Sequence, residues 1–330
     1  MKKQRIVTLD LIRLVAILLV IMQHAWTGLQ LDEPSAGTGR FFYHALVVIG
    51  VPLFFMLSGA LLLGTPTQPI PNFLRKRFKR LLTPFLLWGT VVYALSVVMH
   101  KYPDISTFTA AVRNYIPYML SDKVNASYWY IFVLIGLYLL TPFMQRALAA
   151  PQGKQLTQYG LLLWLAWILL SAYYPQFGPM RYYSGSAFMY MGFFLCGHYC
   201  VKYLPKGRAN KWIGILGFVV AYVLNVWGLS AGFSTSLAHT LAVISLFILL
   251  QSCSVPRKAK GFVVSSGRYT YTIYFVHVLV VAALCTLDLW GWCPLWLRPI
   301  AITLLSFAIS YLVAYIFDRI RFIPNAWVGI

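Results

Sequence analysis

Ten apolar stretches, each close to the length of a membrane-crossing helix, constrain this chain more than any other feature. A helix needs about 20 predominantly apolar residues to cross the hydrocarbon core of a bilayer. The segments between the stretches are too short for a folded soluble domain. We therefore predict an all-α membrane protein with about ten transmembrane helices, formed by residues 1–330 as a single domain. The predicted spans are 6–26, 41–63, 81–100, 128–147, 155–173, 183–203, 212–231, 237–252, 270–288 and 298–317.

The amino-acid composition supports a membrane protein. Hydrophobic residues make up 60% of the chain and charged residues only 10%, whereas a soluble globular protein carries about 25% charged residues. A water-soluble enzyme and a disordered chain are both excluded by these values. The 5 cysteines lie in or beside the apolar stretches without the spacing of zinc ligands. We expect them to pack as small apolar residues, and we predict no metal site.

The positive charges indicate how the predicted helices are oriented. A formal net charge of +20 would indicate nucleic-acid binding in a soluble domain. With the N-terminus in the cytoplasm, however, most of the 27 lysines and arginines fall in cytoplasmic segments, as the positive-inside rule requires. We therefore predict that both termini are cytoplasmic, and that the charge reflects topology in a bilayer and not a nucleic-acid partner. The exceptions are Arg13, inside the first span, and the external Arg40, Lys101, Arg113, Lys123, Arg181 and Arg298.

The first predicted span carries three polar side chains on one helix face. Arg13 and His24 are eleven residues apart, which brings them within about 20° of each other around the helix, and Asp10 is offset from His24 by about 40°. Charged groups inside a span are costly and by default face a functional interior. Two structural alternatives stay open: Asp10 and Arg13 could form a neutralising pair, and His24 could be hydrogen-bonded to a neighbouring helix.

The axial positions of these side chains separate their possible roles. The helix rises by about 16 Å from Arg13 to His24, which places Arg13 in the cytoplasmic half and His24 near the outer end. Asp10 lies about 21 Å from His24 along the axis and cannot orient the imidazole. A catalytic partner of His24 must therefore come from another helix.

Several segments in chain order resemble the acyltransferase-3 family of integral membrane O-acyltransferases. The first is LDLIRLVAILLVIMQH, which contains the family pattern of a basic residue, ten further residues and a histidine at Arg13 and His24. The others match the second span, the basic loop before the third span, the fourth span and a late Ile-Tyr-x-x-His segment. They are VPLFFMLSG (51–59), RFKRLLTPF (77–85), SYWYIFVLIGLYLLTP (127–142) and YTIYFVHVLV (271–280).

The resemblance implies a reaction that moves an acyl group, usually acetyl, from acetyl-CoA to a hydroxyl of a cell-surface glycan or a lipid-linked sugar. It also implies an integral protein of the bacterial cytoplasmic membrane, with the donor inside and the acceptor often outside. The catalytic histidine would be His24, as general base or acyl carrier, with His277 as a second functional histidine. The residues expected to bind acyl-CoA are Arg13, Ser58, Arg77 and Arg80.

Each remaining prediction competes with a structural alternative. The basic residues at 75–80 could hold the phosphates of coenzyme A, or they could only fix the topology. Trp129 and Tyr130 could stack on an acceptor sugar or belong to the interfacial aromatic belt. Ser58 and Gly59 could let two helices approach closely. The competing function is a transporter or flippase for glycan precursors, although broken helices in two corresponding halves are not evident.

Overall fold

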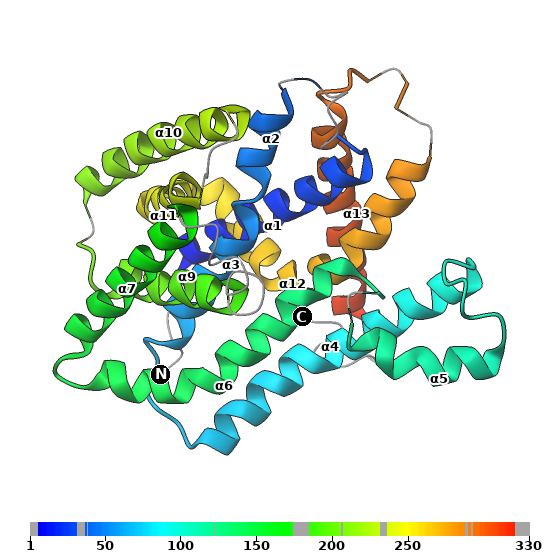
Figure 1. Cartoon of the computed structure of the whole chain (residues 1–330), viewed down its shortest axis with the longest axis horizontal. Coiled ribbons are helices and arrows are strands. Elements are labelled where there is room, and N and C mark those ends of the chain that lie inside the picture. The colour runs from blue at the N-terminus through cyan, green and yellow to red at the C-terminus, as the bar shows by residue number, and fades with distance from the viewer. Residues whose placement is uncertain are drawn as a thin grey trace.

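The computed structural model describes residues 6–31, 37, 39–121, 123–173, 185–205, 207–231, 236–287, 290–291 and 293–320 (Figure 1). These residues form helices joined by turns, with no strand among them. The predicted all-α class is therefore confirmed over the described ranges. The helices are α1 (Val7–Gly28), α2 (Gly39–Val47), α3 (Gly50–Leu62), α4 (Ile70–Val98), α5 (Phe108–Met119), the short 3-10 helix η2 (Ala126–Tyr128), α6 (Trp129–Ala149), α7 (Gly153–Tyr173), α9 (Gly185–Lys202), α10 (Arg208–Ala231), α11 (Ser236–Ser252), α12 (Arg257–Thr286) and α13 (Arg298–Arg319).

Seven helical segments in the described part are long and apolar enough to cross a membrane, with α2 and α3 counted together as Gly39–Leu62. They fit an integral membrane protein. The remaining predicted spans are also helical, as α7, α9 and α11, and α11 has only 17 residues. The number of spans and the orientation of the termini stay predictions. Residues 1–5, Arg181, the start of the predicted span 183–203 and the end of 270–288 lie outside the described residues.

Two predicted element boundaries were wrong. The basic segment 75–80 was predicted as a loop, but α4 begins at Ile70 and includes it. Likewise, α12 begins at Arg257, well before the predicted start at 270. Hydropathy detects only the apolar part of a helix, and lysine and arginine have high helix propensity, so both helices continue into polar sequence. The predicted span 41–63 corresponds to the candidate span Gly39–Leu62, which consists of the two consecutive helices α2 and α3.

The first helix lies in the middle of the bundle and contacts α3, α12 and α13 (Figure 1). Its buried side chains include Ile17 and Val20, which occupy the turns between Arg13 and His24. The predicted polar stripe therefore faces protein and not lipid. Because α1 is one continuous helix, it holds Arg13 toward its N-terminal end and His24 toward its C-terminal end, both inside the bundle.

Two glycines allow α3 and α9 to pack with their backbones in contact. A Cβ atom on Gly59 would overlap the backbone carbonyl of Phe194, and one on Gly197 would overlap the backbone of Met56. Small residues at such positions let membrane helices approach closely. The prediction that Gly59 serves helix packing is confirmed.

Replacing Gly59 and Gly197 by alanine should therefore force α3 and α9 apart. We expect each substitution to destabilise the protein by about 1–3 kcal/mol, as overpacking does in a dense core. Thermal unfolding in detergent measures the effect. The control is Gly136→Ala in α6, where an added Cβ meets nothing within 4 Å. This variant should unfold at or slightly above the wild-type temperature; equal losses in all three variants would contradict the packing argument.

A polar contact outside the long helices fixes the end of α5 to the segment that precedes this helix. The Tyr118 hydroxyl lies 2.6 and 2.7 Å from the two carboxylate oxygens of Asp104, to which it donates. This hydrogen bond lowers the pKa of Asp104 below its ordinary value and raises the pKa of Tyr118 to about 12. Because the pKa of Asp104 is lowered, its stabilising contribution is present at neutral pH and is lost as the pH falls through the lowered value. Along the chain, α5 is followed by η2, which carries Ser127.

Candidate functional site

The N-terminal half of α1 carries a partly buried ion pair. Asp10 is almost fully buried, and its Oδ1 lies 2.5 Å from Nη1 of Arg13. On the neighbouring helix α12, a Cβ atom on Gly267 would lie 2.5 Å from the same carboxylate oxygen, so only glycine leaves room for it. The Asp10–Arg13 pair, which the sequence left open as an alternative, is therefore present, and it fixes the guanidinium group of Arg13.

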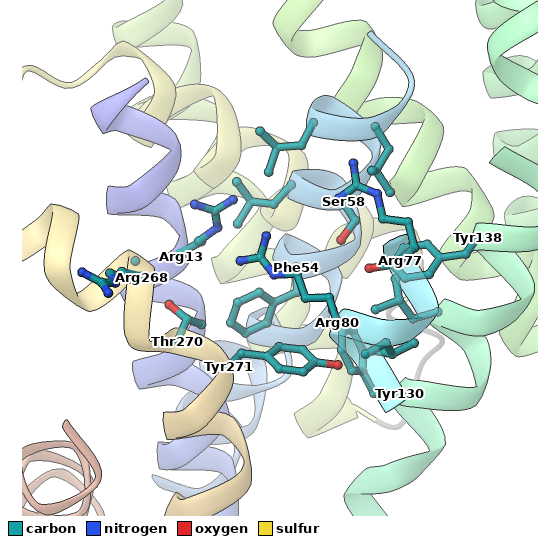
Figure 2. Close-up of a pocket in the computed structure, with 16 residues that line it drawn as sticks. Arg13, Phe54, Ser58, Arg77, Arg80, Tyr130, Tyr138, Arg268, Thr270 and Tyr271 are labelled. Carbon is teal, nitrogen blue, oxygen red and sulfur yellow. The ribbon is translucent and has the colours of Figure 1, made fainter. Parts of the chain in front are cut away.

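Beside this pair, α1, α3, α4, α6 and α12 enclose a cavity of about 360 Å³, which we call the arginine cavity (Figure 2). Helix α1 contributes Arg13, and α4 contributes Arg77 and Arg80. These two residues are three apart on a continuous helix and can therefore reach the same space. The other lining residues are Phe54, Leu57, Ser58, Leu61, Leu62, Leu81, Tyr130, Leu134, Tyr138, Gly267, Arg268, Thr270 and Tyr271.

The charge of the arginine cavity is strongly positive. In Figure 2 the side chains of Arg13 and Arg80 reach toward the same space, whereas Arg268 points to the opposite side. Arg268 is paired there with Asp318, at 2.6 Å. Arg77 and Arg80 make no ion pair with the acidic residues of the described part. The cavity therefore suits an anion that guanidinium groups can bind through paired hydrogen bonds, such as a phosphate.

A second feature, the histidine pair of His24 and His277, lies farther along α1. The centroids of the two imidazole rings are 5.3 Å apart. Nε2 of His24 lies 3.1 Å from the hydroxyl of Ser127 in η2, just before α6. As the axial distances predicted, the partners of His24 come from other elements, namely α12 and η2.

The hydrogen bonding of His277 fixes which of its nitrogens carries the proton. Its Nδ1 lies 2.9 Å from the backbone carbonyl of Ile273, which can only accept, so Nδ1 is the donor. In the neutral ring Nε2 then holds a lone pair. His277 is fully buried, and its Nε2 has no hydrogen-bond partner in the described structure. The pair therefore contains a buried proton acceptor, Nε2 of His277, that bonds no group of the described structure.

Tyr274 connects the arginine cavity to the histidine pair. Its ring centroid lies 5.6 Å from that of Tyr130 and 6.3 Å from that of Tyr271, and both of these line the cavity. On its other side it lies 5.9 Å from His277. The Tyr274 hydroxyl also donates to the backbone carbonyl of Ser127, at 2.7 Å. The histidines do not line the cavity themselves, so a ligand held by the arginines must extend past this tyrosine to reach them.

Comparison with known protein families gives one finding that covers nearly the whole chain. The family model Acyl_transf_3, described as an acyltransferase domain, matches residues 6–318. This chain belongs to the acyltransferase-3 family. Searches of curated proteins and of solved structures give no match. The resemblance carried by the sequence motifs is confirmed, and the protein is a membrane acyltransferase.

In the folded acyltransferase, all four predicted donor-binding residues lie around one cavity. The arginine cavity contains Arg13, Ser58, Arg77 and Arg80, from three helices. Tyr130 also lines this cavity, whereas its predicted companion Trp129 does not. Trp129 is partly exposed, and its ring lies 5.0 Å from that of Tyr190. Successive residues on a helix point about 100° apart, so these neighbours face different surroundings.

Four residues of the acyltransferase site were missed by sequence reasoning. Arg268 was counted only as a topological charge, and Tyr271 only as part of a family motif, although both line the arginine cavity. Ser127 and Tyr274 also lay in matched motifs without an assigned role. The spacing of Arg268 and Tyr271, three residues apart on one helix, was the available signal.

Proposed function

We propose that this acyltransferase moves an acyl group, acetyl in the first instance, from acyl-CoA to a hydroxyl of a cell-surface glycan or a lipid-linked sugar. The observation that carries the proposal is the placement of a positively charged cavity beside a buried histidine pair, in a chain of this family. Coenzyme A has phosphates at one end and its thioester at the end of a long, thin arm. The arginine cavity suits the phosphates, and in this proposal the arm of the donor extends past Tyr274, so that the thioester reaches His24.

In this proposal Arg77, Arg80 and Arg13 bind the phosphates of the donor, and Ser58 lines the same site. Arg77 and Arg80 supply charge that the acidic residues of the described part do not neutralise. The guanidinium group of Arg13 is held in position by the carboxylate of Asp10, with Nη1 and Oδ1 2.5 Å apart. We assign Tyr130, which lines the cavity, to contact with the arm of the donor. Trp129, the first residue of α6, lies outside the cavity lining and is assigned to binding of the acceptor.

His24 is proposed as the general base. It takes the proton of the acceptor hydroxyl, whose oxygen attacks the carbonyl carbon of the thioester. The carbon–sulfur bond then breaks, and the thiolate of coenzyme A takes up the proton. His277, with its free Nε2 lone pair, can accept a hydrogen bond from the charged form of His24. The alternative, in which a histidine first accepts the acyl group, uses the same residues.

Acyl transfer by the purified protein is the test of this function. The protein is incubated with labelled acetyl-CoA and candidate glycans or lipid-linked sugars, and the label is followed into the acceptor. Transfer of label is expected. Absence of transfer from every acyl-CoA, together with movement of glycan across vesicle membranes, would contradict the proposal and favour the competing transporter function.

Ser127 is expected to position His24 through the contact at 3.1 Å. Ser127→Ala should lower acyl transfer about 2- to 10-fold, the value of one net hydrogen bond. It should also shift the pH profile of kcat/KM, because the environment of His24 changes, and leave acyl-CoA affinity unchanged. Ser230→Ala, at an exposed serine whose hydroxyl donates to the Trp227 carbonyl, serves as control. An unchanged pH profile in Ser127→Ala would contradict a positioning role.

A further inference from the structure

A second cavity lies at the other side of the bundle, between the end of α9, the start of α10 and the end of α11. It has a volume of about 410 Å³ and shares no lining residue with the arginine cavity. Nothing in the proposed reaction uses it. We call it the α10–α11 cavity. It is lined by Cys200, Leu204, Pro205, Gly207, Arg208, Asn210, Lys211, Ile248, Gln251 and Ser252.

The shape of this cavity follows from the packing of α10 against α11. An added Cβ on Gly214 would lie 2.7 Å from the backbone nitrogen of Leu249, so the two helices touch there. From this contact α10 extends about 9 Å to Arg208, whereas α11 extends only about 4.5 Å to Ser252. The longer helix therefore projects past the shorter one, and the space beneath the end of α11 is left open.

Side-chain hydrogen bonds hold the walls of the cavity in place. The Asn210 amide donates to the Pro205 carbonyl, and the Gln251 amide donates to the Cys200 carbonyl at 3.5 Å. The floor is apolar, with Leu204 and Ile248. The cavity thus combines an apolar floor with a polar rim.

The rim of the α10–α11 cavity is cationic and adjoins the lipid-facing surface of α10. Arg208 and Lys211 supply two positive charges, and none of the lining residues is acidic. The apolar side chains that follow Lys211 along α10 are largely exposed, including Trp212 at 62%, Ile213 at 59% and Leu216 at 63%. A ligand with a phosphate in the cavity would therefore have its remaining atoms beside an apolar membrane surface.

We propose that the α10–α11 cavity binds the headgroup of an anionic phospholipid. The phosphate contacts Arg208 and Lys211, the headgroup hydroxyls or glycerol contact Gln251 and Ser252, and the acyl chains lie along the exposed face of α10. Basic residues at the membrane surface attract anionic lipid in general. The enclosed volume with fixed polar walls adds a site for one molecule. This proposal is independent of the acyltransferase reaction.

Native mass spectrometry of the full-length protein tests the proposal. The protein is released from micelles containing equal amounts of phosphatidylglycerol and phosphatidylcholine, and the retained lipids are counted. Wild type should keep phosphatidylglycerol in preference to phosphatidylcholine. The double variant Arg208→Gln with Lys211→Gln should bind phosphatidylglycerol at least about tenfold more weakly, because charge-assisted hydrogen bonds are lost. Ser252→Phe, which fills the cavity and keeps both cations, should also lose the lipid.

The matched control is Arg257→Gln with Lys258→Gln, which removes two positive charges at the start of α12, outside the cavity lining. It should retain phosphatidylglycerol as wild type does. Equal retention in every variant, or equal retention of the two lipids by wild type, would overturn the proposal. A further arm adds glycerol 3-phosphate and coenzyme A in place of lipid. Binding of these soluble phosphates without retention of phosphatidylglycerol would show a soluble-phosphate site and contradict the lipid assignment.

Discussion

His24→Ala is expected to lower acyl transfer by at least about 100-fold, the lower range for loss of a general base. His24 is in contact with both Ser127 and His277, at the far end of α1 from the arginines. Its removal should therefore leave donor binding intact, because the arginine cavity does not include it. Turnover of labelled acetyl-CoA measures the first effect, and calorimetric titration with a non-transferable acyl-CoA analogue measures the second.

The control for this variant is His100→Asn, at an exposed histidine that follows α4. His100 has a positive φ of 53°, and asparagine tolerates this conformation. Its turnover should equal that of wild type. Turnover near the wild-type rate in His24→Ala would refute the assignment of His24, and a parallel loss of donor affinity would show that the substitution disturbs the bundle as a whole.

His24 and His277 also allow the general-base mechanism to be distinguished from the acyl-carrier mechanism. Wild type is mixed with labelled acetyl-CoA in the absence of acceptor and then denatured. A general-base mechanism predicts no label on the protein, since attack requires the acceptor hydroxyl. An acyl-carrier mechanism predicts label that disappears in His24→Ala or in His277→Gln.

Removal of Arg77 and Arg80 is expected to have the second large effect. Each charge-assisted hydrogen bond to a phosphate contributes about 1.5–3 kcal/mol. The double variant Arg77→Ala with Arg80→Ala should therefore weaken acyl-CoA binding by about 100-fold or more. Titration calorimetry measures the affinity directly.

Helix α4 itself supplies the matched control for this prediction. Arg75 and Lys76 belong to the same basic segment, are exposed and do not line the arginine cavity. Their joint replacement by alanine removes the same charge and should change donor affinity only slightly. Equal weakening of acyl-CoA binding in the two double variants would mean that the segment acts through its overall charge. Unchanged affinity in both variants would contradict the assignment of the arginine cavity as the donor site.

The sequence was sufficient for features that depend on one helix at a time. Hydropathy located the apolar helices, and helical periodicity placed Arg13 and His24 on one buried face of α1. It also excluded Asp10 as a partner of His24. These predictions succeed because a helix repeats its geometry regularly, so spacing converts directly into direction and distance.

Contacts between helices could not be predicted in this way. His24 and His277 lie 253 positions apart in the chain, and nothing in the periodicity of α1 or α12 indicates that their rings meet at 5.3 Å. The position of Arg268 at the cavity was missed for a related reason, because the hydropathy pattern placed the start of α12 at residue 270, the edge of its apolar part. The helix continues beyond that edge and carries Arg268 into the wall of the arginine cavity.

The central claim is that the donor is bound at the arginine end of the bundle, and that the acyl group is transferred at the histidine end. One measurement tests it most directly. The protein is reconstituted into vesicles in a single orientation, acetyl-CoA is supplied on the face that carries Arg77 and Arg80, and a membrane-impermeant acceptor is confined to the opposite face. We predict that the confined acceptor becomes acetylated. Transfer that occurs only when both substrates share the arginine face would contradict the claim.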